Sequence, residues 1–180
     1  MGNHFWFISD LMLGQDNCSD VEDCWKNVVM DEDVIFLLGN VAVHNKAYWF
    51  NEIQKMPGRK VLFLGTLETN RPAWYSKFDF EEVVPFTQTR TLQHAYGKIM
   101  LSHLPAYESV QATNDGKFMG LIRKFNQEFD SNSGILNIHG HTQGKGTERH
   151  NTIDVSHAVV KGNIPNLTQL IQMLRDKNNK

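Results

Sequence analysis

The chain has 180 residues, of which 41% are hydrophobic and 21% are charged, and its formal net charge is -2 at pH 7. This length predicts one domain, residues 1–180, with a core large enough to fold without disulfides. The composition excludes a strongly basic nucleic-acid binder, and the longest apolar runs, about seven residues, fall far short of the roughly 18 that a membrane-spanning helix needs.

The first half of the chain alternates between predicted strands and predicted helices. Residues 5–8, 34–38 and 60–64 are almost entirely apolar, which is typical of strands buried on both faces. Residues 20–30 and 46–56 carry apolar side chains at helical spacing. Apolar strands separated by amphipathic helices predict a parallel sheet covered by helices.

The second half predicts a different arrangement. Residues 83–92 and 95–102 read as neighbouring antiparallel strands, and residues 134–139 and 152–155 as two more such strands. The predicted helices of this half span residues 117–129 and 166–176, and residues 177–180 are predicted to be a frayed tail. The predicted fold class is therefore α/β, with a two-layered mixed β-sheet sandwich flanked by helices.

The two cysteines, Cys18 and Cys24, lie six residues apart where the first helix is predicted to begin. We expect their side chains to be too far apart for a disulfide. Unpaired cysteines fit a reducing compartment, so a cytoplasmic location is expected.

Five short segments carry polar residues that could form a site. Four of them directly follow apolar, β-favouring runs, which is where an α/β sheet presents its ligand-binding loops. The segments are Ser9-Asp10-Leu11-Met12, Leu38-Gly39-Asn40, Gly65-Thr66-Leu67-Glu68, Leu101-Ser102-His103 and His139-Gly140-His141-Thr142-Gln143.

The order and spacing of these segments resemble the calcineurin-like metallophosphoesterase family, and in particular its small phage and bacterial members, over about residues 5–174. In that family the corresponding loops read D-x-H, G-D, G-N-H-[DE], S-H and G-H-x-H. The resemblance implies a four-layered fold of helices, two sheets and helices. It also implies a pair of divalent ions that activate a bridging hydroxide and hold the phosphate oxygens.

By this resemblance, the first metal ion would be held at positions 10, 12, 40 and 143. Asp10 is retained, but Met12 and Gln143 stand where histidines are expected, and Asn40 replaces the bridging aspartate. Thioether and amide groups are poor ligands for Mn, Fe or Zn in a site of oxygen and nitrogen donors. We therefore expect the first ion to bind very weakly.

The second ion would be held at positions 40, 66, 103 and 141. His103 and His141 are retained, whereas Thr66 replaces an asparagine. Two histidines with an uncharged amide and a hydroxyl would hold one Zn or Mn ion only weakly. No other cofactor is expected. Leu67 occupies the position of the proton-donating histidine, and an alkyl group cannot transfer a proton, so no residue is assigned a catalytic role.

The replacements change charge more than shape. Asparagine for aspartate and leucine or glutamine for histidine leave the volume similar, so the loops could keep their conformation. Carboxylates clustered without metal ions would repel one another, and neutral residues relieve that repulsion. We interpret the pocket as adapted to being metal-free.

The retained residues also have explanations that involve no metal. Asp10 could stabilise a turn at the end of a strand, and His103 and His141 could hydrogen-bond to the backbone. A rearranged metal site would draw on other histidines, namely His139, His150 and His157.

The predicted function is that of a pseudo-phosphoesterase, which keeps the scaffold and acts by binding a protein or a nucleotide, as a phage-encoded factor would in the host cytoplasm. The alternative is a metal-dependent phosphodiesterase or phosphatase of low activity with a residual one-metal site at His103 and His141. A homodimer is a further expectation, and Trp74 and Tyr75 are the candidates for an exposed aromatic patch that meets a partner. Neither a membrane nor a nucleic acid is expected as a partner.

Overall fold

The computed structural model of the protein describes residues 4–15, 19–68, 70–95, 97–106, 118–131, 136–144 and 151–178. Within these residues the chain forms two four-stranded sheets with helices around them. The elements are, in chain order, β1 Phe5–Ile8, α1 Ser19–Val28, β2 Val34–Leu38, α2 Lys46–Gln54, β3 Arg59–Phe63, α3 Pro72–Tyr75, β4 Glu82–Val84, β5 Arg90–His94, β6 Gly97–Leu101, α4 Met119–Ser131, β7 Leu136–His139, β8 Thr152–Asp154, α5 His157–Val160 and α6 Leu167–Asn178.

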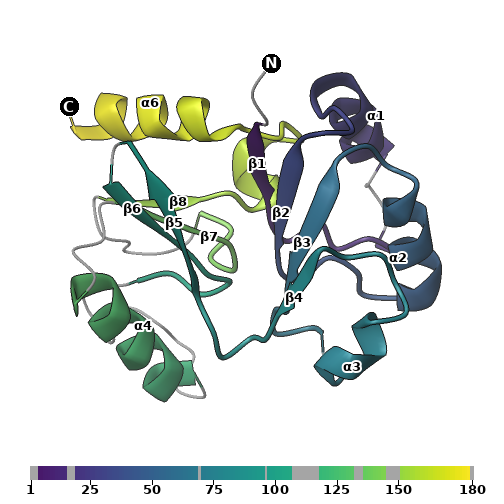
Figure 1. Cartoon of the computed structure of the whole chain (residues 1–180), viewed down its shortest axis with the longest axis horizontal. Coiled ribbons are helices and arrows are strands. Elements are labelled where there is room, and N and C mark those ends of the chain that lie inside the picture. The colour runs from purple at the N-terminus through teal and green to yellow at the C-terminus, as the bar shows by residue number, and fades with distance from the viewer. Residues whose placement is uncertain are drawn as a thin grey trace.

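The first sheet has the strand order β1-β2-β3-β4 and is parallel throughout. Every residue of β2 is buried, because a central parallel strand has both of its faces covered. The helices α1 and α2 connect successive strands and lie on one side of the sheet (Figure 1). Parallel strands require such crossovers, since a tight turn would reverse the chain direction. This half confirms the predicted alternation of strands and helices.

The second sheet has the order β5-β6-β7-β8. The strands β5 and β6 pair antiparallel, as predicted, with His94 opposite Gly97. The pairs β6–β7 and β7–β8 are parallel, so the predicted antiparallel direction of the strands at 134–139 and 152–155 was wrong. The chain passes through α4 between β6 and β7, and this long crossover lets it re-enter the sheet in the same direction.

The predicted strand 83–92 is in fact two strands that belong to different sheets. β4 pairs with β3 in the first sheet, whereas β5 pairs with β6 in the second. Pro85 directly follows β4 and has no N–H for a ladder hydrogen bond. Its carbonyl instead accepts a turn hydrogen bond from Gln88 N at 2.9 Å. The chain therefore crosses from one sheet to the other at this proline.

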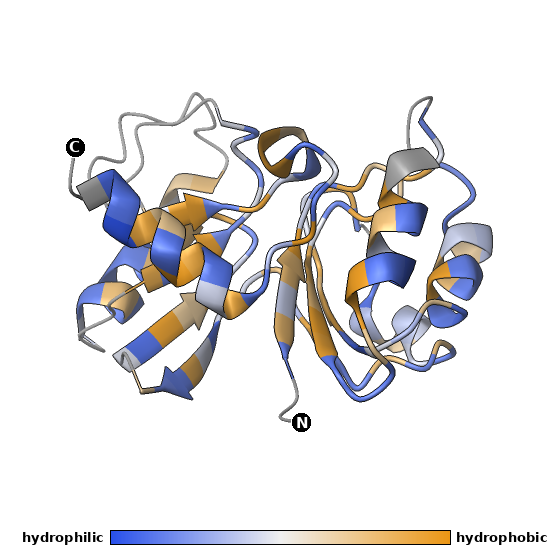
Figure 2. Cartoon of the chain, turned by 90° about the horizontal axis from the view of Figure 1, so that it is seen from above, coloured by the Kyte–Doolittle hydropathy of each residue, from blue (hydrophilic) through white to orange (hydrophobic). Residues whose placement is uncertain are grey.

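The two sheets pack face to face, and side chains from both fill the space between them. Phe7 and Phe36 of the first sheet stack with ring centroids 5.2 Å apart and share a buried cluster with Ile99 and Leu101 of β6. Met100, between those two residues, faces the other way and packs with α4. In Figure 2 the strands of the first sheet are mostly hydrophobic, while the helices alternate between hydrophobic and hydrophilic residues. The structure confirms a two-layered sandwich flanked by helices.

Smaller expectations need correction. The helix α6 extends to Asn178, so Lys177 is helical and not part of a frayed tail. Tyr75 is fully buried and Trp74 packs against Phe50, so these rings belong to the core beside α2 and do not form an exposed patch. The four-residue helices α3 and α5 escaped prediction because a single turn carries no periodic pattern.

Cys18 lies outside the described residues, and Cys24 has a free thiol. Within the residue ranges given above, no helix combines the length and apolar content needed to cross a membrane.

Candidate functional site

The loops that follow the strands of both sheets meet at one place. Asp10 and Asn40 follow the parallel strands β1 and β2, whose carboxyl ends lie at the same edge of the first sheet. Backbone hydrogen bonds join the loops, from Asp10 N to Gly39 O at 2.9 Å and from Gly140 N to His103 O at 3.1 Å. Segments from both sheets are therefore held together around Asp10.

The Asp10 carboxylate is buried, and two N–H groups and two hydroxyl groups of the protein lie around it. Its Oδ1 accepts a hydrogen bond from Asn40 Nδ2 at 2.9 Å, and its Oδ2 accepts one from His141 N at 2.7 Å. The hydroxyls of Ser9 and Ser156 lie 2.6 Å and 3.2 Å from Oδ2. Two N–H groups therefore donate to this carboxylate, one to each oxygen, while the Ser9 and Ser156 hydroxyls each have a second acceptor, in Leu38 O and Asp154 Oδ1.

The Asn40 side chain connects Asp10 to the loop after β3. While its amide nitrogen donates to Asp10, its Oδ1 accepts hydrogen bonds from Leu67 N at 2.9 Å and from Thr66 Oγ1 at 3.2 Å. Only a group that both donates and accepts can make this connection, and an ionised aspartate cannot donate. The Asn40 carboxamide therefore links Asp10 to the Thr66–Leu67 loop through direct hydrogen bonds.

Glu68 holds the backbone of the same loops. Its carboxylate is buried and accepts hydrogen bonds from the backbone N–H groups of Gly65, Asn40 and Val41 at 2.7, 2.8 and 2.8 Å. Burial raises the pKa of Glu68, and these three hydrogen bonds oppose that rise. Lys46, the first residue of α2, donates a hydrogen bond from Nζ to Leu67 O and so connects α2 to this loop.

His103 is buried and neutral at physiological pH. Its Nδ1 lies 2.7 Å from Leu38 O, and because a carbonyl can only accept, Nδ1 carries the proton. Its Nε2 is buried without a hydrogen-bond partner among the described residues. Burial lowers the pKa of His103 to about 4, against the opposing influence of Asp10. An unprotonated ring nitrogen therefore remains inside the site.

Aromatic rings surround the two retained histidines. The rings of His103 and His141 have centroids 5.1 Å apart. Phe86 lies 5.9 Å from His103, Phe118 lies 6.3 Å from His141, and the two phenylalanines are 5.2 Å from each other. Both histidines thus belong to a four-ring cluster in addition to the polar loops.

The backbone at the predicted ligand positions has an unusual conformation. Asp10, Met12, Asn40, His141 and Gln143 have φ angles of 53°, 54°, 53°, 71° and 50°. Only two other non-glycine residues in the described part of the chain have a positive φ, namely Asn45 and Lys161. This left-handed conformation costs about 1 kcal/mol per residue, and such strain is concentrated at functional sites. Five of the seven left-handed non-glycine residues in the described part of the chain therefore fall at positions where the resemblance predicts metal ligands.

Only some of the predicted ligand residues have side chains or backbone groups in the hydrogen-bond network around Asp10. Asp10, Asn40, Thr66 and His141 are connected through hydrogen bonds, whereas Gln143 is exposed. Met12 is half-buried and donates from its backbone N–H to Asn40 O.

The donor set does not fit a two-metal centre, since the Asp10 oxygens are bonded to protein donors and the bridging position presents an amide N–H. Across the described ranges, no group of three or more His, Cys, Asp or Glu side chains is placed to hold a metal ion, and this includes the rearranged site with His139 and His157. His150 lies outside the described residues. His139 is buried, with Nδ1 2.8 Å from Gly140 O.

Sequence reasoning missed several contributors to the site. Ser9 and Glu68 lie within the quoted motifs but received no role, and their positions beside Asp10 and Leu67 were the available signal. Ser156 is 146 residues from Asp10, and no motif marked it. Asp154 holds Ser156 in place by accepting from its backbone N–H at 2.7 Å. Burial acts to raise the pKa of Asp154, but His139 and the hydrogen bonds it accepts outweigh burial and lower it.

Replacing Gly140 by alanine is expected to lower the free energy of unfolding by about 3 kcal/mol, because overpacking at a closely packed site forces the surroundings to shift. An added Cβ would lie 1.8 Å from Ser9 Oγ and 2.6 Å from Asp10 Oδ2. Urea denaturation measures the change. Gly120→Ala is the matched control, because no atom lies within 4 Å of its added Cβ, and it should stabilise the protein by about 0.5 kcal/mol. Equal effects of the two substitutions would contradict the close packing around Asp10.

Comparison with known proteins bears on the fold. No protein-family model matches the chain, and no curated protein matches its sequence. A protein from Aquifex aeolicus has the same fold. That protein, described as of unknown function, aligns with a TM-score of 0.76 and 18% identity over 96% of this chain and all of its own.

Two other solved structures match at a lower level. An archaeal phosphodiesterase aligns with a TM-score of 0.47 and 11% identity over 77% of this chain and 72% of its own. A predicted phosphoesterase from Streptococcus pneumoniae aligns with a TM-score of 0.42 and 13% identity over 87% and 72% of the two chains. At this level of similarity neither match assigns an activity to this chain.

Proposed function

We propose that this protein is a pseudo-phosphoesterase, which has the phosphoesterase-like scaffold but acts by binding a protein or nucleotide partner. The observation that carries the proposal is the Asn40 carboxamide, which bonds Asp10 on one side and the Thr66–Leu67 loop on the other. The loops are held together by direct hydrogen bonds, so the site needs no metal ion to keep its shape.

Electrostatics support the same proposal. Two neighbouring dications need an anionic bridge and terminal ligands with free lone pairs. Here the bridging position is uncharged, and the carboxylate of Asp10 is already bonded to protein donors. Leu67, at the position of the expected general acid, contributes a backbone N–H to the network and has no side-chain proton to transfer.

One observation favours a second candidate, a phosphodiesterase or phosphatase of low activity with a single Zn or Mn ion. His103 Nε2 is a buried lone pair without a partner among the described residues, and the His141 ring lies close to it. Neutral imidazole nitrogen is a good zinc ligand. Two histidines without a charged ligand would bind such an ion weakly, which is why this candidate ranks second.

Metal content and hydrolysis separate the two candidates. After dialysis against buffer, the protein is expected to hold well under one equivalent of Zn or Mn by elemental analysis. It should also hydrolyse bis-p-nitrophenyl phosphate no faster than buffer, because both the bridge and the acid are absent. One tightly held equivalent, with hydrolysis that His103→Ala abolishes, would establish the enzyme instead. His44→Ala is the matched control, since His44 is exposed and outside the network.

The setting of the proposed binding function follows from the resemblance to small phage and bacterial proteins. We place the protein in the cytoplasm, and in the host cytoplasm if a phage encodes it. A homodimer remains a proposal, which light scattering would test through the molar mass in solution.

A further inference from the structure

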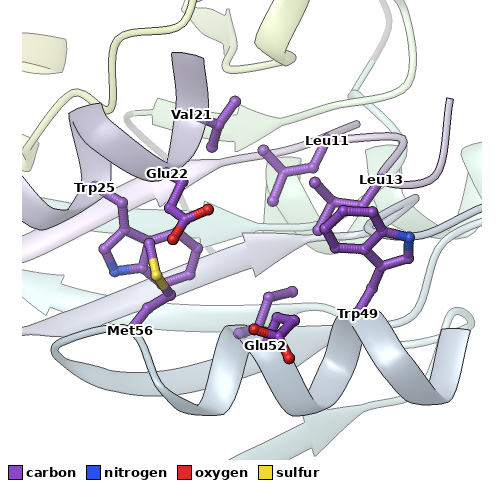
Figure 3. Close-up of a pocket in the computed structure, with 9 residues that line it drawn as sticks. Leu11, Leu13, Val21, Glu22, Trp25, Trp49, Glu52 and Met56 are labelled. Atoms are coloured by element: carbon purple, nitrogen blue, oxygen red, sulfur yellow. The ribbon is translucent and has the colours of Figure 1, made fainter. Parts of the chain in front are cut away.

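A small groove lies between α1 and α2, on the helix-covered side of the first sheet and apart from the Asp10 network (Figure 3). Its volume is about 50 Å³. Val21 and Trp25 of α1 form one wall, and Trp49 and Ile53 of α2 form the other. Trp25 is buried and anchored by a hydrogen bond from its Nε1 to Pro57 O at 2.9 Å, whereas Trp49 is half-buried and keeps part of its ring accessible.

The groove and the candidate site share one segment of the chain. Leu11 and Leu13 line the groove, and Asp10, directly before them, forms the centre of the polar network. Leu13 is fixed by a backbone hydrogen bond to Val41 O at 2.9 Å. The floor of the groove is therefore held by the same loops that form the site, and it is pre-formed for binding.

Acidic side chains line this apolar groove. The carboxylates of Glu22, from α1, and Glu52, from α2, are among the groups that line it (Figure 3). Each pairs through Oε1 with a nearby lysine, Glu22 with Lys26 of α1 at 2.5 Å and Glu52 with Lys55, directly after α2, at 2.6 Å. These pairs are largely exposed, and exposed pairs contribute about 0–1 kcal/mol, so the carboxylates can exchange partners.

The charge of α1 adds to this acidic character. Among the side chains of α1 that the structure describes, Glu22 and Asp23 oppose a single lysine, Lys26, which leaves an excess of one negative charge. An apolar floor with acidic walls complements a side chain that has an apolar stem and a cationic head.

The size of the groove limits what can enter it. The small volume of about 50 Å³ favours the end of one side chain over a bulkier nucleotide. Among cationic side chains, arginine has a planar head that stacks on an indole face and bonds carboxylates with two N–H groups at once.

We propose that the groove between α1 and α2 receives an arginine side chain from a basic segment of a partner protein. The aliphatic stem lies on Leu11 and Ile53, the guanidinium stacks on Trp49, and its N–H groups bond Glu22 and Glu52. The groove lies outside the Asp10 network. The test of this proposal is therefore independent of the test for phosphodiester hydrolysis.

The test uses a blocked 12-residue peptide with three arginines, and matched peptides in which citrulline or leucine replaces every arginine. Titration into ¹⁵N-labelled protein is followed through the indole N–H signals. The arginine peptide should shift the signals of Trp49 and Trp25 and leave those of Trp6 and Trp74 in place. The citrulline and leucine peptides should bind at least tenfold more weakly.

Variants make the test specific to the groove. The double variant Glu22→Gln with Glu52→Gln should weaken binding of the arginine peptide at least fivefold, whereas Glu81→Gln, which removes an exposed carboxylate elsewhere, should not. Glu22 is exposed and Glu52 is half-buried, and both substitutions keep the size of the side chain, so the spectrum should otherwise overlay that of the wild type. Equal binding of the citrulline or leucine peptide, or no shift at Trp49, would overturn the proposal.

Discussion

Replacing Asn40 by aspartate is expected to lower the free energy of unfolding at pH 7 by about 3 kcal/mol in the absence of metal, which is typical of leaving a buried charge uncompensated. The substitution removes the donor that bonds Asp10 Oδ1 at 2.9 Å and sets a second carboxylate in its place. Thermal or urea denaturation in the presence of a chelator measures the change. Asn51→Asp is the matched control, because Asn51 is exposed on α2, and its effect should stay within about 0.5 kcal/mol.

The deficit in unfolding free energy that Asn40→Asp causes should depend on pH in a predictable direction. Two adjacent buried carboxylates resist losing their last shared proton. The pKa for this loss is therefore raised above the pKa of an aspartate in the unfolded chain. A raised folded-state pKa stabilises the protein at low pH and loses that contribution as the pH rises. The deficit should therefore shrink when the pH is lowered from 7 to 5. A deficit that is small at pH 7, or that does not change with pH, would contradict the role given to the Asn40 amide.

Introducing the family's ligand residues at the five positions where this chain departs from the resembled motifs is expected to create a metal site. The variant carries Met12→His, Asn40→Asp, Thr66→Asn, Leu67→His and Gln143→His. It should bind about two Mn²⁺ ions per chain, as a two-metal centre does. The reason is that positions 10, 12, 40, 141 and 143 keep the left-handed backbone from which ligands would project. Calorimetric titration measures the stoichiometry. At a metal concentration 100 times the Kd, the gain in unfolding free energy should be about 2.7 kcal/mol.

The control for this variant keeps Asn40 and changes the other four residues. Without the anionic bridge it should bind Mn²⁺ at least tenfold more weakly, which the same titration reports. A fivefold variant that folds, as judged by circular dichroism, but binds no Mn²⁺ would mean that the loop geometry does not match that of a two-metal centre.

The first sheet shows where sequence patterns are sufficient. The predicted strands at 5–8 and 34–38 coincide with β1 and β2, because strands buried on both faces are apolar at every position. The predicted strand at 83–92 was wrong, because its β-favouring residues continue past Pro85 although the pairing partner changes there. Strand direction at β7 and β8 was also wrong, since every residue of both strands is buried and a uniformly buried segment does not reveal the direction of its neighbours.

By itself, the sequence determined which chemical groups stand at the loops, and therefore that Asn40 and Leu67 can contribute neither an anionic bridge nor a transferable proton. Only the tertiary structure decided where the remaining charge of Asp10 is satisfied. Its partners Asn40, His141 and Ser156 are 30, 131 and 146 residues away along the chain. A residue's identity sets its charge and its donors, whereas a hydrogen bond depends on distances of about 3 Å between loops that only the packing of the two sheets brings together.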